Sequence, residues 1–306
     1  YDGNIVTEAI GWKQQGRIDE EEFRHIEDIA EPCPGSCAML GTANTMSALS
    51  ESLGMSLMGS STIPAVLAAR MAKGVETGEK IVELVQKGVT TRDILTEEAF
   101  ENAVMHLLTM GGSTNGILHL QAIYHEAGLG ELPLSVFDEF SRKIPQVASI
   151  YPASEFDMVD FYEGGGVPAV LKEIEEYLHK DTLTVSGLTM GEALSRFSYT
   201  NNRNMIKTAE EPFAPTGGVA ILKGNIAPLG CVIKPAAVPK HMFRYSGRAQ
   251  VFTTEEESYQ AVLEGRVKPG TCMVLMYEGP KGGPGMPEMY KTMKYLEGMG
   301  LSDTCA

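Results

Sequence analysis

Long apolar runs and basic residues are both scarce in this 306-residue sequence. No uninterrupted apolar stretch approaches the roughly 18 residues that a membrane-spanning helix needs, and no signal-peptide pattern is visible. Lysine and arginine number 25 against 40 aspartates and glutamates, which gives a net charge of −15. Because nucleic acids and anionic membranes are bound through clustered basic side chains, we expect neither as a partner.

Cysteine is infrequent as well. Of the five cysteines only Cys33 and Cys37 lie close together, and the other three show no ligand spacing. This is unlike the dense framework of small disulfide-bonded secreted proteins. We therefore expect a reducing compartment, the cytoplasm, or an organelle matrix if a targeting segment has been lost. Solenoid-length repeats and low-complexity tracts are also absent.

The stretch from Cys33 to Met46 is the first candidate for chemistry. It reads Cys-Pro-Gly-Ser-Cys-Ala-Met-Leu-Gly-Thr-Ala-Asn-Thr-Met, so Cys37 lies between a Pro/Gly turn and the start of an expected helix. A thiol in this position experiences the helix dipole and the free N–H groups, which favour the metal-binding thiolate. The alternative is a buried structural cysteine, which is the commoner role of a single cysteine.

The second candidate is residues 111–115, Gly-Gly-Ser-Thr-Asn, which precede an expected helix at 116–127. The glycines let the backbone approach a ligand, and Ser113 or Thr114 can cap the helix. Free N–H groups at a helix N-terminus form a receptor for a carboxylate or phosphate. The alternative, plain capping with close helix packing, is favoured by the local sequence alone.

The third candidate is residues 278–288, whose four glycines and three prolines exclude regular structure. Glu278 and Glu288 flank this loop and offer the hard oxygen ligands that magnesium prefers. The alternative for Glu288 is an acidic residue in the first turn of the next helix, where it interacts favourably with the helix dipole.

Caps and glycines predict the helix boundaries. Thr96, Thr189 and Thr254 are expected N-caps, the last two opening capping boxes. Gly74 and Gly78 are expected to interrupt the helical pattern, which gives separate helices at 65–73 and 77–87.

Alternating elements predict an α/β class. Short strands at 145–150 and 182–185, separated by a helix at 167–178, indicate a layered α/β domain in which parallel pairing is expected. A polar, proline-containing stretch at 201–215 indicates a connection. Beyond it the chain becomes β-rich, at 219–222, 231–233, 250–252 and 272–277. We expect an α/β domain over 1–205 and a smaller, incomplete β-rich domain over 206–306.

Four blocks of sequence span nearly the whole chain, and they are residues 35–46, residues 99–102 together with 111–115, residues 217–228, and residues 277–288. In the same order, these blocks resemble those of the dihydroxy-acid dehydratase and phosphogluconate dehydratase family of iron–sulfur hydro-lyases, which also includes sugar-acid dehydratases. For the C-terminal domain the resemblance implies a small barrel, incomplete here.

The resemblance also implies a reaction, the dehydration of a 2,3-dihydroxy acid to a 2-oxo acid, and a homodimer. By resemblance Cys37 is a ligand of an iron–sulfur cluster and Glu288 a ligand of magnesium. Ser113, Thr114 and Asn115 would help shape the substrate pocket.

Two departures from the family pattern matter. The family's other two cluster cysteines and its Cys-Asp-Lys magnesium signature lie upstream of anything in this sequence, and the serine taken as catalytic base lies beyond Ala306. We therefore expect the middle of a longer enzyme, and we expect the 306-residue chain alone to hold no stable cluster and to be inactive.

Three functions remain open from the sequence. The sequence Thr-Ala-Asn-Thr-Met at 42–46 resembles the branched-chain dihydroxy-acid enzymes more than the other members of the family. The runner-up is a sugar-acid or phosphogluconate dehydratase. From a different class, the chain could be an inert folded remnant or a binding module.

Overall fold

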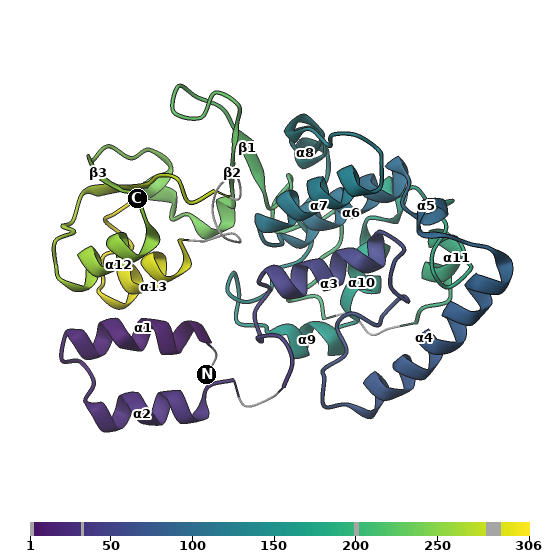
Figure 1. Cartoon of the computed structure of the whole chain (residues 1–306), viewed down its shortest axis with the longest axis horizontal. Coiled ribbons are helices and arrows are strands. Elements are labelled where there is room, and N and C mark those ends of the chain that lie inside the picture. Colours follow the sequence, from purple (N-terminus) through teal and green to yellow (C-terminus); the bar gives the residue numbers. More distant parts are fainter. Residues whose placement is uncertain (1–2, 32–33, 199–201, 280–288) are drawn as a thin grey trace. The chain divides into compact units, whose positions relative to one another are not determined.

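The computed structural model describes residues 3–31, 34–198, 202–279 and 289–306. Its contacts divide the chain into two compact units, a larger one formed by Cys33–Ala237 and a smaller one formed by Tyr1–Pro32 with Val238–Ala306. Figure 1 shows the elements of both units. The expected boundary between residues 205 and 206 falls inside the larger unit, and the division into domains at that point stays a prediction.

Helix α6 (Glu97–Met110) is the centre of the larger unit (Figure 1), and every residue from Asn102 to Met110 is buried. Thr96 caps it as predicted, accepting a hydrogen bond from the N–H of Ala99. The other elements of this unit are α3 (Thr42–Ser52), α4 (Ala68–Lys87), α5 (Thr91–Ile94), α7 (Asn115–Glu126), α8 (Leu134–Lys143), α9 (Met158–Glu163), α10 (Gly166–Glu173), the 3₁₀ turns η1 (Glu175–Tyr177) and η2 (Pro235–Ala237), α11 (Met190–Ser195), β1 (Ala220–Leu222) and β2 (Cys231–Ile233).

The apolar core of the larger unit lies on both sides of α6. One cluster contains Met105 and Met110 and surrounds Phe161. The other contains Leu107 and Leu108 and packs against helices α3, α7 and α8. Because α6 is enclosed on all sides, the segments that flank its C-terminal end are held at fixed positions.

The two expected strands of the N-terminal half are wrong as sheet strands. Residues 145–150 form only the isolated bridges Gln146↔Ala214 and Ala148↔Ile206, and residues 182–185 form only Leu183↔Thr189. Both segments are extended, but their N–H groups bond to scattered partners in place of a neighbouring strand. The N–H of Gln146 donates to the carbonyl of Ala214, that of Val147 to Thr109 and that of Ser149 to Met205. A run of buried apolar residues therefore did not distinguish a strand from a buried extended connection.

The expected interruption at Gly74 and Gly78 is also wrong. Helix α4 runs without a break from Ala68 to Lys87 and ends at Gly88 in the left-handed conformation. Glycine costs an interior helix position about 1 kcal/mol relative to alanine, which the surrounding helix-forming residues can offset.

The smaller unit joins the two ends of the chain. Helix α1 (Gly3–Gln14), which is followed by α2 (Glu20–Ile29), packs against α13 (Tyr290–Gly298). A Cβ placed on Gly11 would lie 2.8 Å from the carbonyl carbon of Gly298, so both glycines are needed for this close helix contact. The 3₁₀ turn η3 (Lys240–Phe243), strand β3 (Arg248–Phe252), α12 (Glu255–Leu263) and β4 (Thr271–Leu275) complete this unit.

The β-rich segments of the C-terminal part were predicted correctly in position. Strands β1 and β2 pair antiparallel, with Ile221 opposite Val232, and β3 and β4 pair parallel, with Gln250 opposite Met273. The described strands form two two-stranded sheets and no closed barrel. The fold is therefore a mixed helix-and-sheet structure in which helix predominates. No helix among the described residues combines the length and the hydrophobicity needed to cross a bilayer.

Candidate functional site

Cys37 lies in the turn that leads into helix α3, and its side chain is half-buried. A Cβ built on Gly41, the N-cap of α3, would lie 3.9 Å from the Cys37 Sγ, so the sulfur is next to the start of the helix. Gly41 provides no side-chain cap for α3. The arrangement places a thiol beside the positive end of a helix dipole, as the sequence predicts.

Asn44 fixes the conformation of this turn. Its buried side chain donates from Nδ2 to the carbonyls of Cys37 and Met39, both at 2.7 Å, and its Oδ1 accepts from the Ser36 hydroxyl at 2.7 Å. One amide thus satisfies three polar groups of the loop. Asn44 belongs to the block at residues 35–46 but was not predicted as a site residue. Its role depends on the turn at Cys37 folding back onto its side chain, which the sequence alone does not show.

The start of helix α7, which carries Ser113, Thr114 and Asn115, lies against the start of α3. Thr42 Oγ1 and Ser113 Oγ share a hydrogen bond of 3.0 Å, and Asn115 Nδ2 donates to Thr42 Oγ1 at 2.9 Å. The N–H of Ser113 donates to Thr45 Oγ1 at 3.0 Å. Two of the three candidate stretches are therefore brought together by helices that are distant in sequence.

Glycines make this contact possible. A Cβ on Gly112 would lie 2.9 Å from Thr45 Cγ2, and one on Gly116 would lie 3.3 Å from the same atom. The segment 217–218 joins them, since a Cβ on Gly218 would lie 2.7 Å from the Gly111 Cα. Three of the four family-like blocks therefore meet in the larger unit.

The first-turn N–H groups of α7 already have partners. The N–H of Asn115 donates to Ser113 Oγ at 3.3 Å, and the N–H groups of Gly116 and Ile117 donate to the carbonyls of Ser113 and Thr114. Capping and close packing, the alternative considered from the sequence, thus account for much of this geometry. These contacts bring two hydroxyls, those of Thr42 and Ser113, together at the helix ends.

The described residues do not complete the donor set of an iron–sulfur cluster. Such a cluster is usually held by several cysteine thiolates, and Cys37 is the thiol at this site. Cys33 and Glu288 fall outside the described residues, and Cys231 lies exposed on strand β2. Within the described part of the chain no group of three His, Cys, Asp or Glu side chains could hold a metal ion. Cys37 fits as one ligand of a larger set.

Glu51 is a buried carboxylate that the sequence interpretation missed. It is fully buried on α3 and accepts hydrogen bonds from the N–H groups of Gly59 (2.7 Å) and Ser61 (2.6 Å). Burial raises its pKa to about 7, although these hydrogen bonds and nearby Lys73 act in the opposite direction. The sequence signal that could have identified Glu51 was helical spacing, which puts it on the same face of α3 as Asn44 and Ala48.

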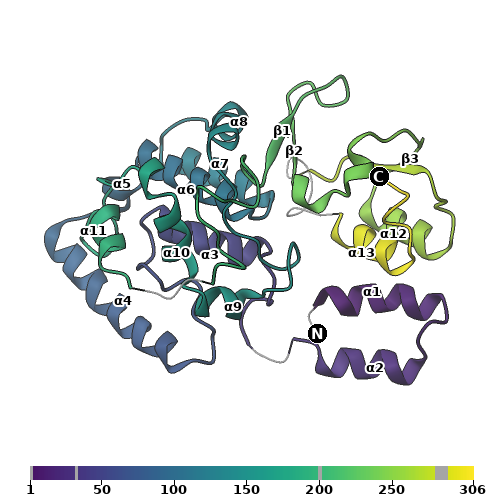
Figure 2. The same cartoon turned by 180° about the vertical axis from the view of Figure 1, so that it is seen from behind.

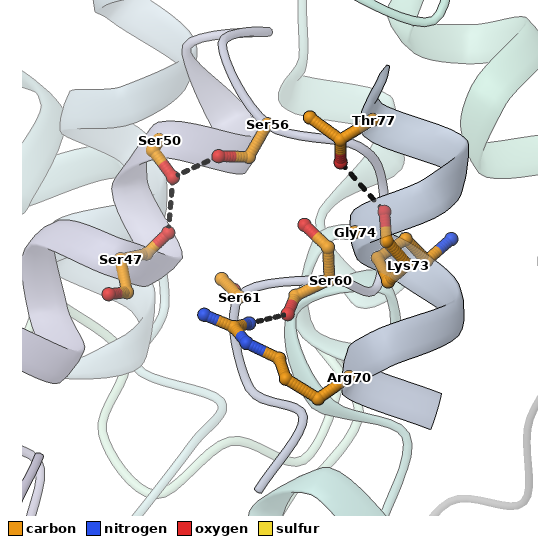
Figure 3. A pocket seen from close by; sticks show the side chains of 9 residues that line it. All are labelled: Ser47, Ser50, Ser56, Ser60, Ser61, Arg70, Lys73, Gly74 and Thr77. Atoms are coloured by element: carbon orange, nitrogen blue, oxygen red, sulfur yellow. Dashed lines mark hydrogen bonds between the residues drawn. The ribbon is translucent and has the colours of Figure 1, made fainter. Parts of the chain in front are cut away.

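An open pocket of about 360 Å³ lies between α3 and α4 (Figure 3). It is polar, and its lining residues are Ser47, Ser50, Ser56, Ser60, Ser61, Arg70, Lys73, Gly74 and Thr77. Arg70 donates to the Ser60 carbonyl at 2.8 Å, and Lys73 pairs with Glu76 at 2.7 Å. Both cations are thus engaged by the protein itself.

Glu51 should make the stability of the larger unit depend on pH. Its folded pKa of about 7 lies above the ordinary 4.5, so the folded state binds the proton more tightly. The resulting stabilisation is complete below about pH 4.5 and is lost as the pH rises through 7. We expect the free energy of unfolding to fall by roughly 2–3 kcal/mol more between pH 5 and 8 in the parent than in Glu51→Gln.

Urea unfolding at several pH values measures this difference. Glu79→Gln, at an exposed position of α4, is the matched control and should keep the parental pH profile. Parallel profiles for the parent and Glu51→Gln would contradict the prediction.

Comparison with known proteins agrees with the blocks that meet in this structure. The sequence profile described as dihydroxy-acid/6-phosphogluconate dehydratase N-terminal matches residues 2–193, and the corresponding C-terminal profile matches residues 204–306. A dihydroxy-acid dehydratase of Caldanaerobacter subterraneus subsp. tengcongensis is 47% identical over all of this chain and 55% of its own length. One from Methanococcoides burtonii is 45% identical over 98% of this chain and 55% of its own length.

A third relative, a dihydroxy-acid dehydratase of Ignicoccus hospitalis, is 47% identical over 96% of this chain and 53% of its own length. The chain thus spans about half the length of the curated relatives it matches. The two profiles cover nearly every residue, including Cys37 and the segments that meet beside it. The chain belongs to the dihydroxy-acid/6-phosphogluconate dehydratase family.

Proposed function

We propose that the complete protein dehydrates a 2,3-dihydroxy carboxylic acid to a 2-oxo acid, as a dihydroxy-acid dehydratase of branched-chain amino-acid biosynthesis. The observation that supports this most is the meeting of the Cys37 turn with Ser113 and Asn115 at the starts of α3 and α7. In a chain of this family, the contact puts a metal-binding type of residue next to alcohol and amide groups suited to a polyhydroxy acid.

Cys37 is proposed as one ligand of an iron–sulfur cluster, whose other ligands lie outside the described residues. When bound, a cluster with an open iron position supplies a Lewis acid for the departing hydroxyl. Glu288 is proposed as a magnesium ligand, in keeping with the preference of that ion for carboxylate oxygens.

The residues of this chain bind and orient the substrate in this proposal. The Thr42 and Ser113 hydroxyls, 3.0 Å apart, can exchange their mutual hydrogen bond for bonds to substrate oxygens. Asn115 holds Thr42 in place through its Nδ2 group. Thr114, the N-cap residue of α7, makes no side-chain capping hydrogen bond and is proposed to help shape the substrate pocket.

For the whole enzyme we propose that the C-terminal strands belong to a small barrel completed by further residues, and that the layered α/β domain is completed in the same way. The complete enzyme is proposed to be a homodimer. The incomplete barrel fits the finding that the described strands pair only in twos.

The test is turnover by the complete protein, purified without oxygen and supplied with magnesium. We expect 2,3-dihydroxyisovalerate to give a 2-oxo acid, detected as its hydrazone, at a rate at least tenfold above those with gluconate, 6-phosphogluconate or arabinonate. The 306-residue chain under the same conditions should hold no stoichiometric iron and should be inactive. Preference for a sugar acid would replace the substrate assignment, and an inert complete protein would refute the enzymatic function.

A further inference from the structure

Lys234 differs from the other half-buried lysines that the structure describes. Those lysines form ion pairs with glutamates or lie over an aromatic ring, and they are Lys73, Lys80, Lys207 and Lys294. The ammonium group of Lys234 has no hydrogen bond or ion pair with any described residue. It is therefore a cation that is partly removed from water and has no counter-charge among these residues.

The register of strands β1 and β2 determines the direction in which this lysine points. Ala220 is opposite Ile233 at the end of the ladder, so the next two residues, Val219 and Lys234, are opposite each other when the register continues. In an antiparallel pair, residues directly opposite each other have their side chains on the same face. Val219 is fully buried, so the Lys234 side chain starts from the inward face of this hairpin.

The burial of the other hairpin residues agrees with this orientation. Ile221 and Val232 lie two residues away on the same face, and both belong to the apolar cluster that packs against α3, α7 and α8. Leu222 and Cys231, on the opposite face, are exposed. Figures 1 and 2 show the hairpin from opposite sides, next to α8, which contacts β1.

A lysine on an apolar, inward face is unfavourable without a partner. Burial lowers the pKa of Lys234, because the charged form loses part of its hydration. Lysine is seldom buried in proteins unless its charge is paired. The position therefore indicates that Lys234 binds an anion that the described residues do not supply.

The inward face at Lys234 is next to the candidate site. Gly218 directly precedes Val219, and a Cβ on Gly218 would lie 2.7 Å from the Gly111 Cα. Gly111 is two residues before Ser113, which makes the contact between the starts of α3 and α7. The end of the hairpin that carries Lys234 is thus packed on the segment that leads into the site.

The described residues of the candidate site supply no positive charge for an anionic substrate. The side chains of Thr42, Ser113 and Asn115 are uncharged, and the whole chain has a net charge of −15. Dihydroxy acids and 2-oxo acids are both anions at neutral pH, because carboxyl groups ionise well below pH 7. An ammonium group binds a carboxylate through charge-assisted hydrogen bonds, which are stronger than those of hydroxyls or amides.

We propose that Lys234 binds the carboxylate of the dihydroxy-acid substrate and of the 2-oxo acid product in the complete enzyme. This inference rests on the proposed function and assigns to it a further binding residue, on the hairpin formed by β1 and β2.

The substitution Lys234→Met tests this role, because methionine keeps an unbranched apolar side chain and removes the charge. In calorimetric titration of the complete protein with 2-oxoisovalerate, the product expected from 2,3-dihydroxyisovalerate, we expect the Kd to rise roughly 10- to 100-fold. Lys234→Arg, which keeps the charge, should recover part of the affinity. Lys223→Met removes an exposed lysine of the same hairpin and is the matched control, with a Kd close to that of the parent.

The uncharged amide of 2-oxoisovalerate separates carboxylate recognition from a general disturbance of the pocket. Its Kd should be the same in Lys234→Met and in the parent, since the amide offers no charge to lose. In turnover of 2,3-dihydroxyisovalerate, Lys234→Met should raise KM by a factor similar to that for the product Kd and leave kcat near the parental value. The thermal midpoint should not fall, because the substitution removes a desolvated charge.

The outcomes distinguish this inference from the proposed function. An unchanged Kd for 2-oxoisovalerate in Lys234→Met would overturn the inference, while turnover by the parent would leave the proposed function intact. A Kd that rises equally for the acid and the amide, or a thermal midpoint that falls by several degrees, would show that Lys234 pairs with another part of the polypeptide and would also overturn it.

Two further outcomes concern the parent protein. An inert parent that binds 2-oxoisovalerate through Lys234 would refute the enzymatic function and keep Lys234 as a carboxylate-binding residue. A parent that binds no 2-oxoisovalerate would overturn the inference.

Discussion

Replacing Cys37 by serine is expected to abolish the visible absorbance of the iron–sulfur cluster in the complete enzyme and to reduce turnover to background. Serine presents an oxygen that is a poor ligand for cluster iron, whereas thiolate is the ligand these clusters require. The side chain is half-buried beside Gly41, so exchanging sulfur for oxygen removes little packing. We expect the free energy of unfolding of the apoprotein to change by less than about 1 kcal/mol.

The measurement is absorbance and iron content after anaerobic reconstitution, with circular dichroism as the check on folding. Cys231→Ser is the matched control because Cys231 is exposed on β2, and it should retain both absorbance and activity. Full absorbance in Cys37→Ser would refute the ligand assignment.

Replacing Asn44 is expected to destabilise the turn that carries Cys37 without removing any proposed ligand. Asn44→Ala loses the hydrogen bonds to the carbonyls of Cys37 and Met39 and to the Ser36 hydroxyl. Leaving these groups without their partner should lower the free energy of unfolding by about 2–4 kcal/mol. Asn44→Asp should be worse, on the order of 4 kcal/mol or more, because a carboxylate would face two carbonyl oxygens.

Both variants should also bind iron less tightly, since the turn that carries Cys37 loses its anchor. Urea unfolding measures the first effect, and iron retention during gel filtration measures the second. Asn204→Asp, at an exposed position, should resemble the parent in both. If Asn44→Ala unfolded at the parental urea concentration and kept its iron, the positioning role would be excluded.

Local features such as helix caps were predicted from the sequence more successfully than contacts between distant segments. Thr189 and Thr254 cap helices as predicted, because a cap depends on residues only three or four positions apart. The full capping box forms at Thr189, whereas the box predicted at Thr254 is wrong, because the Glu257 carboxylate accepts from the N–H of Thr253. The predicted interruption of the helix at Gly74 and Gly78 was wrong. The free-energy cost of glycine in a helix is small compared with the stabilisation that the other residues of α4 supply.

For the site, the sequence singled out Cys37 and Ser113–Asn115 separately but gave no indication that Thr42 connects them. Such a contact depends on how α3 and α7 pack, which no local pattern encodes. Asn44 and Glu51 were missed for the same reason, because their importance comes from burial. The role of Glu288 stays a prediction, since it lies outside the described residues.

The contact between α1 and α13 has a consequence for biosynthesis. The ammonium group of Lys294 binds the Glu8 carboxylate across 286 residues of sequence. On a ribosome that adds about 5–20 residues per second, α1 would therefore wait on the order of 15 to 60 s for the helix that packs against it. During that time the intervening Cys33–Ala237 segment can already collapse around α6, so the smaller unit is completed only after the residues of the larger one have been translated.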